Sequence, residues 1–86
     1  MKPNRLETVI PPVRFRHDKA IVTIYEVTKT RLINGQYIYN VNLDITYKKK
    51  KSQRFTLFVK NWDDLLKKLL VEIPKFKLMV LMGYVK

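Results

Sequence analysis

Strict alternation of apolar and polar side chains in residues 36–48 (QYIYNVNLDITYK) is the feature that most restricts the fold of this chain. Such a period of two predicts a half-buried β-strand. Residues 20–32 (AIVTIYEVTKTRL) are rich in β-branched side chains, and the dipeptide Asn34-Gly35 separates the two segments. Because Asn-Gly accepts the positive φ values of a type I′ turn, residues 20–48 are predicted to form one long β-hairpin.

The predicted turn also fixes the register of the hairpin. With Asn34 and Gly35 at its centre, the opposed pairs on the core face are Leu32 with Tyr37, Ile24 with Ile45, and Val22 with Tyr47. Tyr39, Val41 and Leu43 share this face. Glu26 also falls on it, so a β-bulge near Glu26 is expected to turn the carboxylate away. The opposite, wet face is predicted to gather Tyr25, Lys29, Arg31, Ile38, Asn40, Asn42, Thr46 and Lys48.

A third strand and a helix are expected after the lysine run at residues 48–51. Residues 53–60 (QRFTLFVK) alternate again, which sets Phe55 beside Ile45 and Leu57 beside Leu43. Arg54, Thr56, Phe58 and Lys60 then join the wet face. Asn61 is expected to cap a helix that Pro74 ends. Its apolar residues recur at helical spacing and predict packing on the sheet: Trp62, Leu65, Leu66, Leu69, Leu70 and Ile73.

The two ends of the chain complete the predicted fold. Residues 75–86 (KFKLMVLMGYVK) are too apolar to lie free in water and are expected to form a last strand or an interface segment. Residues 7–10 and 13–15 are predicted to be short edge strands, because Pro11-Pro12 cannot donate to a central ladder. The expected fold class is α+β, a twisted antiparallel sheet of about four strands with one amphipathic helix on one face. Residues 1–86 are expected to form a single small basic domain, with flexibility expected at residues 1–6.

Charge narrows the classes of function. The 86 residues contain 18 Lys and Arg against 7 Asp and Glu, and the net charge of +11 repels itself unless an anion is near. A hydrophobic content of 47% argues against a disordered basic tail. The chain has no cysteine, and its longest apolar run is far shorter than the ~20 residues of a membrane span. We therefore expect a cytoplasmic protein with no membrane contact.

Catalysis finds little support in the sequence. His17 is the single histidine, and the acidic residues Glu7, Asp18, Glu26 and Asp44 share no motif. Two-metal hydrolases need clustered carboxylates, and phosphate-binding loops need glycines at fixed spacing. The expectation is a protein that is not an enzyme, with no catalytic residue, metal site, cofactor or small-molecule substrate.

Nucleic-acid binding agrees better with the wet face. Basic residues follow phosphates by counterion release, and aromatic rings stack on unpaired bases. The alternative is a solvated face whose lysines only prevent edge-to-edge pairing of sheets. For Trp62, a packing role and a binding role both stay open. The predicted binding residues are Tyr25, Lys29, Arg31, Asn40, Lys48, Lys49, Lys50, Lys51, Arg54, Phe58, Lys60 and Trp62.

Residues 55–70 (FTLFVKNWDDLLKKLL) resemble the strand-to-helix signature of the single-stranded-DNA-binding transcriptional coactivator p15 family, also called positive cofactor four. In that signature an alternating strand runs into a short polar turn, a tryptophan and an amphipathic helix. The matching residues are Phe55, Leu57, Val59, Trp62, Leu65 and Leu69. The resemblance implies a homodimer whose curved sheets form channels for single-stranded or unpaired DNA, and it carries over Trp62 as a binding position. The longer hairpin and the C-terminal segment depart from the family pattern.

The leading hypothesis is a homodimer that binds single-stranded DNA or RNA without sequence preference and acts in strand protection or transcription. Richness in Lys, Ile and Tyr is typical of an AT-rich genome, such as that of an archaeon or its virus. A second hypothesis is a regulatory module that joins an assembly through its apolar C-terminal segment. A third is a chromatin-like protein that binds duplex DNA.

Overall fold

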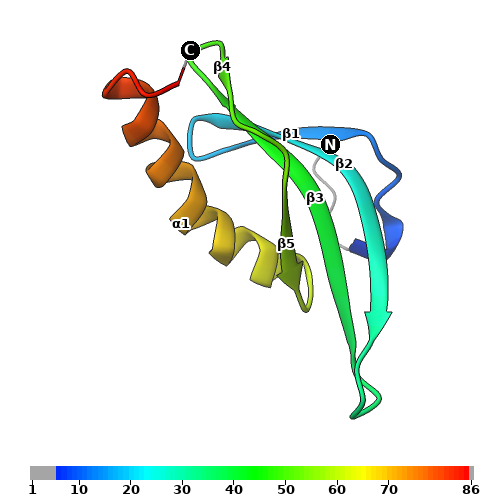
Figure 1. Ribbon diagram of the computed structural model, residues 1–86. Coiled ribbons are helices and arrows are strands. Elements are labelled where there is room, and N and C mark those ends of the chain that lie inside the picture. The colour runs from blue at the N-terminus through cyan, green and yellow to red at the C-terminus, as the bar shows by residue number, and fades with distance from the viewer. Residues whose placement is uncertain (1–5, 86) are drawn as a thin grey trace.

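A computed structural model describes residues 6–85 and shows an antiparallel sheet of five strands with one long helix running obliquely along one face (Figure 1). The sheet order is β1, β2, β3, β4, and β5 also pairs with β3. The predicted α+β class is therefore confirmed, with five strands in place of about four. The elements are η1 (Leu6–Thr8), β1 (Val13–His17), β2 (Ala20–Arg31), β3 (Tyr37–Tyr47), β4 (Lys50–Lys51), β5 (Phe55–Val59) and α1 (Trp62–Leu81).

The central hairpin of β2 and β3 forms as predicted, but its turn is longer by one residue. Leu32 and Gln36 close the loop, with the Leu32 N–H donating to the Gln36 carbonyl at 2.7 Å. Gly35 has a φ of 85°, whereas Asn34 does not enter the left-handed region. This is the geometry of a type I turn followed by a G1 bulge, not of a type I′ turn. Asn34 serves the turn through its side chain, whose Oδ1 accepts the Gln36 N–H at 3.0 Å.

The longer turn moves the register of the hairpin by one residue. Arg31 lies opposite Tyr37 where Leu32 was predicted, and Leu32 is 41% exposed. Because side chains alternate along a strand, this shift turns the outer half of β2 over. The predicted register is therefore wrong at this end, and Lys29 moves to the face that carries α1.

The predicted β-bulge near Glu26 is confirmed. The register shifts between Ile24 and Glu26, which brings Glu26 opposite Asn42 and away from the core face. The bulge turns the inner half of β2 back, so that Ile24 lies opposite Leu43. As a result, five of the predicted core residues are buried, namely Val22, Ile24, Val41, Leu43 and Ile45, although Ile24 pairs two residues away from its predicted partner. Leu32 and Tyr37, predicted on the same face near the hairpin tip, are exposed instead.

Type I′ turns occur at two other places. Asp18 and Lys19 have φ values of 49° and 63°, and Lys48 and Lys49 have values of 50° and 65°. Both central residues of each turn are thus left-handed, which suits the twist of a tight hairpin. The first turn joins β1 to β2 and the second joins β3 to β4.

The β4 and β5 strands lie along the same side of β3, with residues 52–54 between them. The Ser52 hydroxyl accepts the Ile45 N–H at 2.9 Å, and the Ser52 N–H donates to the Ile45 carbonyl at 2.8 Å. In β5, Phe55 pairs with Leu43 and Leu57 pairs with Val41. The predicted face of this strand is confirmed, whereas its predicted register was two residues away.

Helix α1 begins where predicted and continues past its predicted end. The Asn61 side chain accepts the Asp64 N–H at 2.8 Å, and the Asp64 carboxylate accepts the Lys60 N–H at 3.0 Å. Pro74 lies inside the helix, so a stop at Pro74 is wrong, and residues 75–81 are helical rather than a last strand. Pro74 removes one backbone donor on the exposed side, while Ile73 and Phe76 are buried and hold both halves on the sheet.

The hydrophobic core lies between the sheet and α1. Its buried residues are Leu6, Phe15, Ala20, Val22, Ile24, Val41, Leu43, Ile45, Val59, Trp62, Leu65, Leu69, Ile73 and Phe76. The strand predicted at 13–15 is confirmed as β1, but residues 6–8 form a 3-10 helix where an edge strand was predicted at 7–10. The prediction of a flexible start falls on residues 1–5, outside the described residues, and on Leu6, which is buried.

Candidate nucleic-acid interface

The sheet face turned away from α1 is here named the open face. Within the described residues, three segments contact the other face. Helix α1 and the C-terminal tail (residues 82–85) lie beside Ile45 and Phe55, and η1 lies beside Val27 and Tyr39. Strand pairing assigns alternate residues to the open face. Its members on β1, β2, β3 and β5 are Arg14, Arg16, Ile21, Thr23, Glu26, Thr28, Thr30, Ile38, Asn40, Asn42, Asp44, Thr46, Thr56 and Phe58.

Tyr25, Asp44 and Arg54 form a cluster on this face. The Tyr25 hydroxyl donates to Oδ2 of Asp44 at 2.6 Å, and the Arg54 guanidinium lies 3.6 Å from the centre of the Tyr25 ring. Asp44 is only 2% exposed. The hydrogen bond to Asp44, followed by burial, raises the pKa of Tyr25 above its ordinary value. Tyr25 is therefore neutral at physiological pH, with a cation stacked on its ring.

Amide and hydroxyl groups continue the open face towards the hairpin tip. The Asn40 side chain donates to the hydroxyls of Thr28 at 3.0 Å and Thr30 at 2.7 Å. The Asn42 side chain donates to the Thr56 hydroxyl at 3.3 Å. These bonds run between strands and hold both amides in fixed positions on the sheet.

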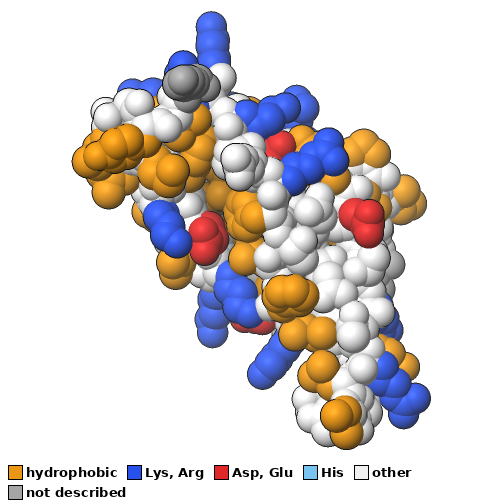
Figure 2. Space-filling model, in the orientation of Figure 1, with side chains coloured by type: hydrophobic (Ala, Val, Ile, Leu, Met, Phe, Trp, Pro, Cys, Tyr) orange, Lys and Arg blue, Asp and Glu red, His pale blue; other side chains and the backbone are white. Residues whose placement is uncertain are grey.

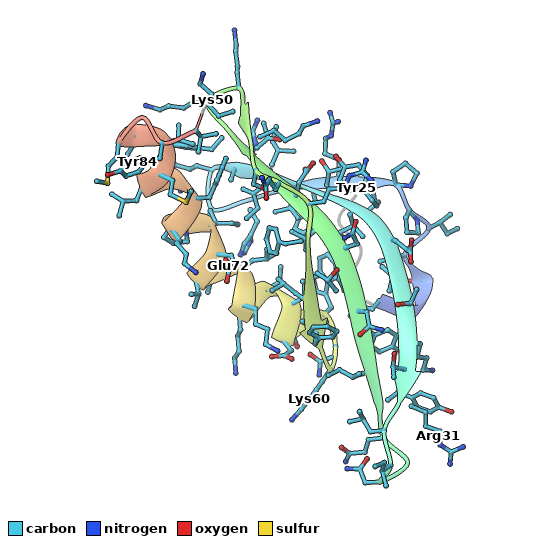
Figure 3. The ribbon with its side chains drawn as sticks, viewed as in Figure 1. Tyr25, Arg31, Lys50, Lys60, Glu72 and Tyr84 are labelled. Carbon is cyan, nitrogen blue, oxygen red and sulfur yellow. The ribbon has the colours of Figure 1, made fainter. Side chains whose placement is uncertain are left out.

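Phe58 supplies a free aromatic ring next to these amides. It lies opposite Asn40 on the adjacent strand and is 56% exposed. A ring of this kind on a polar surface is available for stacking on a base. The structure therefore brings Tyr25, Asn40, Arg54 and Phe58, all predicted from the sequence, onto one face. Lys60 projects from the end of β5 (Figure 3).

Lys29 and Arg31 are not on the open face, so their predicted position on the wet face is wrong. The register places them opposite Tyr39 and Tyr37, on the side that carries α1. The Lys29 ammonium lies 4.2 Å from the centre of the Tyr37 ring and 5.7 Å from that of Tyr39. The physical reason is the extra residue in the hairpin loop. Figure 3 shows Arg31 near the tip of the hairpin, at the opposite end of the molecule from Lys50.

The four lysines at residues 48–51 form a separate cationic end. Lys48 and Lys49 make the turn, and Lys50 and Lys51 form β4. All four are exposed. Lys51 lies opposite Thr46 and so adjoins the open face, whereas Lys50 is opposite Tyr47 on the other side.

The sequence left a packing role and a binding role open for Trp62, and its surroundings are those of a packing residue. It is 7% exposed, and its ring centre lies 5.1 Å from that of Phe15. A ring buried between the helix and the sheet has no free surface for a base.

Arg14 and Arg16 are open-face residues that were not among the predicted binding residues. They are exposed on β1, opposite Thr23 and Ile21. The alternation in residues 13–17 (VRFRH) carries the signal, since Val13 and Phe15 face the core and leave the arginines outside. Arg54 lies on the same face near the opposite edge, just before β5. The open face therefore has basic side chains at both edges.

Lys and Arg side chains are spread around the visible surface rather than gathered at one point (Figure 2). Within residues 6–85, no group of three or more His, Cys, Asp or Glu side chains could hold a metal ion. The same part of the chain contains no helix with both the length and the apolar character needed to cross a membrane. Comparisons with models of known families, with curated proteins and with solved structures found no match. The open face therefore has to be interpreted from its own geometry.

Proposed function

We propose that this protein binds single-stranded nucleic acid, DNA in preference to RNA, across the open face, without catalysis and largely without sequence preference. The observation that carries the proposal is the exposed Phe58 ring on the same uncovered face as the Tyr25 and Arg54 stack. Aromatic and guanidinium surfaces accept any base, because every base has a π-face. Strand protection and transcription are roles that agree with such binding.

The width of the open face supports a single strand. From β1 to β5 there are three strand spacings, or about 14 Å at roughly 4.8 Å each. Arg14 and Arg16 on one edge and Arg54 on the other can contact phosphates, while Phe58, farther along β5 towards the hairpin tip, can stack on a base. Asn40 and Asn42 lie between these edges and can hydrogen-bond to base edges.

Titration of a labelled oligo-dT at several salt concentrations, followed by fluorescence anisotropy, tests this proposal. We expect tight binding at low salt and a steep loss of affinity as salt rises, because bound phosphates release counterions. No binding at low salt, or an affinity indifferent to salt, would contradict it. Competition with duplex DNA distinguishes the chromatin-like alternative, which requires that the duplex displace the single strand. Competition with oligo-rU measures the preference for DNA over RNA.

A further inference from the structure

The outward side of α1 carries an apolar stripe that the core does not use. At about 100° per residue, its six residues fall within an arc of roughly 120° on the side away from the buried Leu69 and Ile73. From residue 70 to residue 82 no charged side chain falls in this arc. Figure 2 shows hydrophobic side chains gathered over the C-terminal half of the helix. This outer stripe consists of the exposed α1 residues Leu70, Val71, Pro74, Leu78 and Leu81 together with the C-cap residue Met82.

The spacing of the outer stripe is symmetric about residue 76. Residue 70 is as far from this centre as residue 82, residue 71 as far as residue 81, and residue 74 as far as residue 78. A two-fold contact between identical chains requires that one patch be complementary to itself. Two antiparallel copies of α1 that cross near residue 76 therefore place every stripe residue opposite another stripe residue. We propose that the outer stripe is the interface of a homodimer with antiparallel α1 helices.

The charges beside the outer stripe favour a second copy over an acidic partner. Lys75 borders the stripe and forms an ion pair with Glu72 at 3.8 Å, so this border carries both signs. A rim of lysines alone would have indicated an acidic segment of another protein. Helices packed at 8–10 Å between axes would remove the six apolar side chains from water.

The dimer leaves the open face free. Because α1 covers one face of each sheet, pairing through its outer side turns the two open faces away from each other. Dimerisation and nucleic-acid binding also respond to salt in opposite directions. Two chains of charge +11 repel, so salt strengthens the dimer by screening, whereas salt weakens binding to phosphates.

Sedimentation equilibrium of the full chain in about 0.5 M salt, where charge repulsion is largely screened, tests the interface. We expect a species of twice the 10.3 kDa chain mass. Leu78→Glu at the centre of the stripe should weaken dimerisation at least about tenfold. Ile33→Glu also replaces an exposed apolar side chain with a carboxylate, but at the hairpin tip, and should leave the dimer intact. A monomer, an open-ended series of oligomers, or a Leu78→Glu dimer as tight as the parent overturns the proposal.

Disulfide trapping tests the antiparallel arrangement. The chain has no cysteine, so Val71→Cys and Leu81→Cys each introduce a single thiol. Residues 71 and 81 of opposite chains meet in the proposed dimer, whereas two residues 71, or two residues 81, are about 15 Å apart, beyond the ~7 Å reach of a disulfide. A mixture of the variants should give the mixed disulfide, and each variant alone should not. Equal cross-linking in the single-variant samples, or none in the mixture, contradicts the arrangement whether or not the protein binds nucleic acid.

Discussion

Tyr25 occupies the extra position of the β2 bulge, and its hydroxyl reaches Oδ2 of Asp44 on β3 at 2.6 Å. The bulge thus has two effects. It returns the inner half of β2 to the core register, and it sets the Tyr25 ring beside Arg54 on the open face. Bulges commonly redirect a side chain in this way. The same local irregularity therefore serves both packing and the proposed binding surface.

Tyr25→Phe should destabilise the protein. The substitution removes the hydrogen bond from Tyr25 to the Asp44 carboxylate, which is only 2% exposed, and bonds to charged groups contribute more to stability than bonds between neutral groups. Urea denaturation of the two proteins measures the difference. Tyr37→Phe, at a half-exposed ring near the hairpin tip, should change the free energy of unfolding by no more than about 0.5 kcal/mol. Equal stability of Tyr25→Phe and the parent would show that the bond to Asp44 contributes nothing.

Asp64→Asn should reduce the acid sensitivity of the fold. The Lys60 N–H holds the pKa of Asp64 below its ordinary value, with a further contribution from Lys68. Because the folded pKa is the lower one, the unfolded chain binds more protons, and stability falls as pH falls through the folded pKa. Urea unfolding from about pH 5 to about pH 2 should show the parent losing its advantage over Asp64→Asn. Asp63→Asn removes the same charge from the same turn, and this variant should lose stability with falling pH as the parent does. A constant difference between parent and Asp64→Asn would exclude this linkage.

The hairpin shows how far the sequence predicts this fold. Alternation places the core face of β3 correctly, and the cost of burying the Glu26 carboxylate predicts the bulge. The dipeptide Asn34-Gly35 is compatible with both a two-residue and a three-residue loop, and the choice depends on pairing along the whole ribbon. A shift of one residue in the register moves every side chain of the strand to the other face of the sheet. For this reason the sequence assigns Lys29 and Arg31 to the wrong face.

Pro74 shows the limit of local rules in the helix. A proline inside a helix destabilises it by about 3 kcal/mol, so the sequence alone predicts that the helix ends at Pro74. Burial of Ile73 and Phe76 on either side offsets this cost, and that packing depends on where the helix lies on the sheet. In the candidate site, too, some residues are predicted by local sequence patterns and others depend on the tertiary fold. Phe58 and Arg54 follow from local alternation, whereas the Tyr25 contact with Asp44 depends on the bulge.

Phe58→Ala should weaken binding to single strands. Stacking of one base on an aromatic ring contributes about 1–3 kcal/mol, which is roughly a 5- to 150-fold loss of affinity for oligo-dT. Tyr84→Ala is the matched control, because Tyr84 is an exposed aromatic residue of the C-terminal tail on the α1 side. Anisotropy titrations at one salt concentration compare the three proteins. An equal loss in both variants would remove Phe58 from the proposed site.

The double variant Arg14→Gln with Arg16→Gln should flatten the salt dependence of binding. Each phosphate contact on a single strand contributes about 0.7 to the slope of log K against log salt, so the slope should fall by about 1.4. Lys67→Gln with Lys75→Gln removes the same charge from α1 and should leave the slope nearly unchanged. Equal slopes in the two double variants would indicate a diffuse effect of net charge instead of contacts at β1.

Chemical-shift mapping of the ¹⁵N-labelled protein during titration with unlabelled oligo-dT identifies the surface that binds the single strand. We expect the shifted backbone amides to gather on the open face, around Arg14, Tyr25, Asn40, Arg54 and Phe58. Shifts gathered along α1 or at the hairpin tip, or no shifts at low salt, would contradict it.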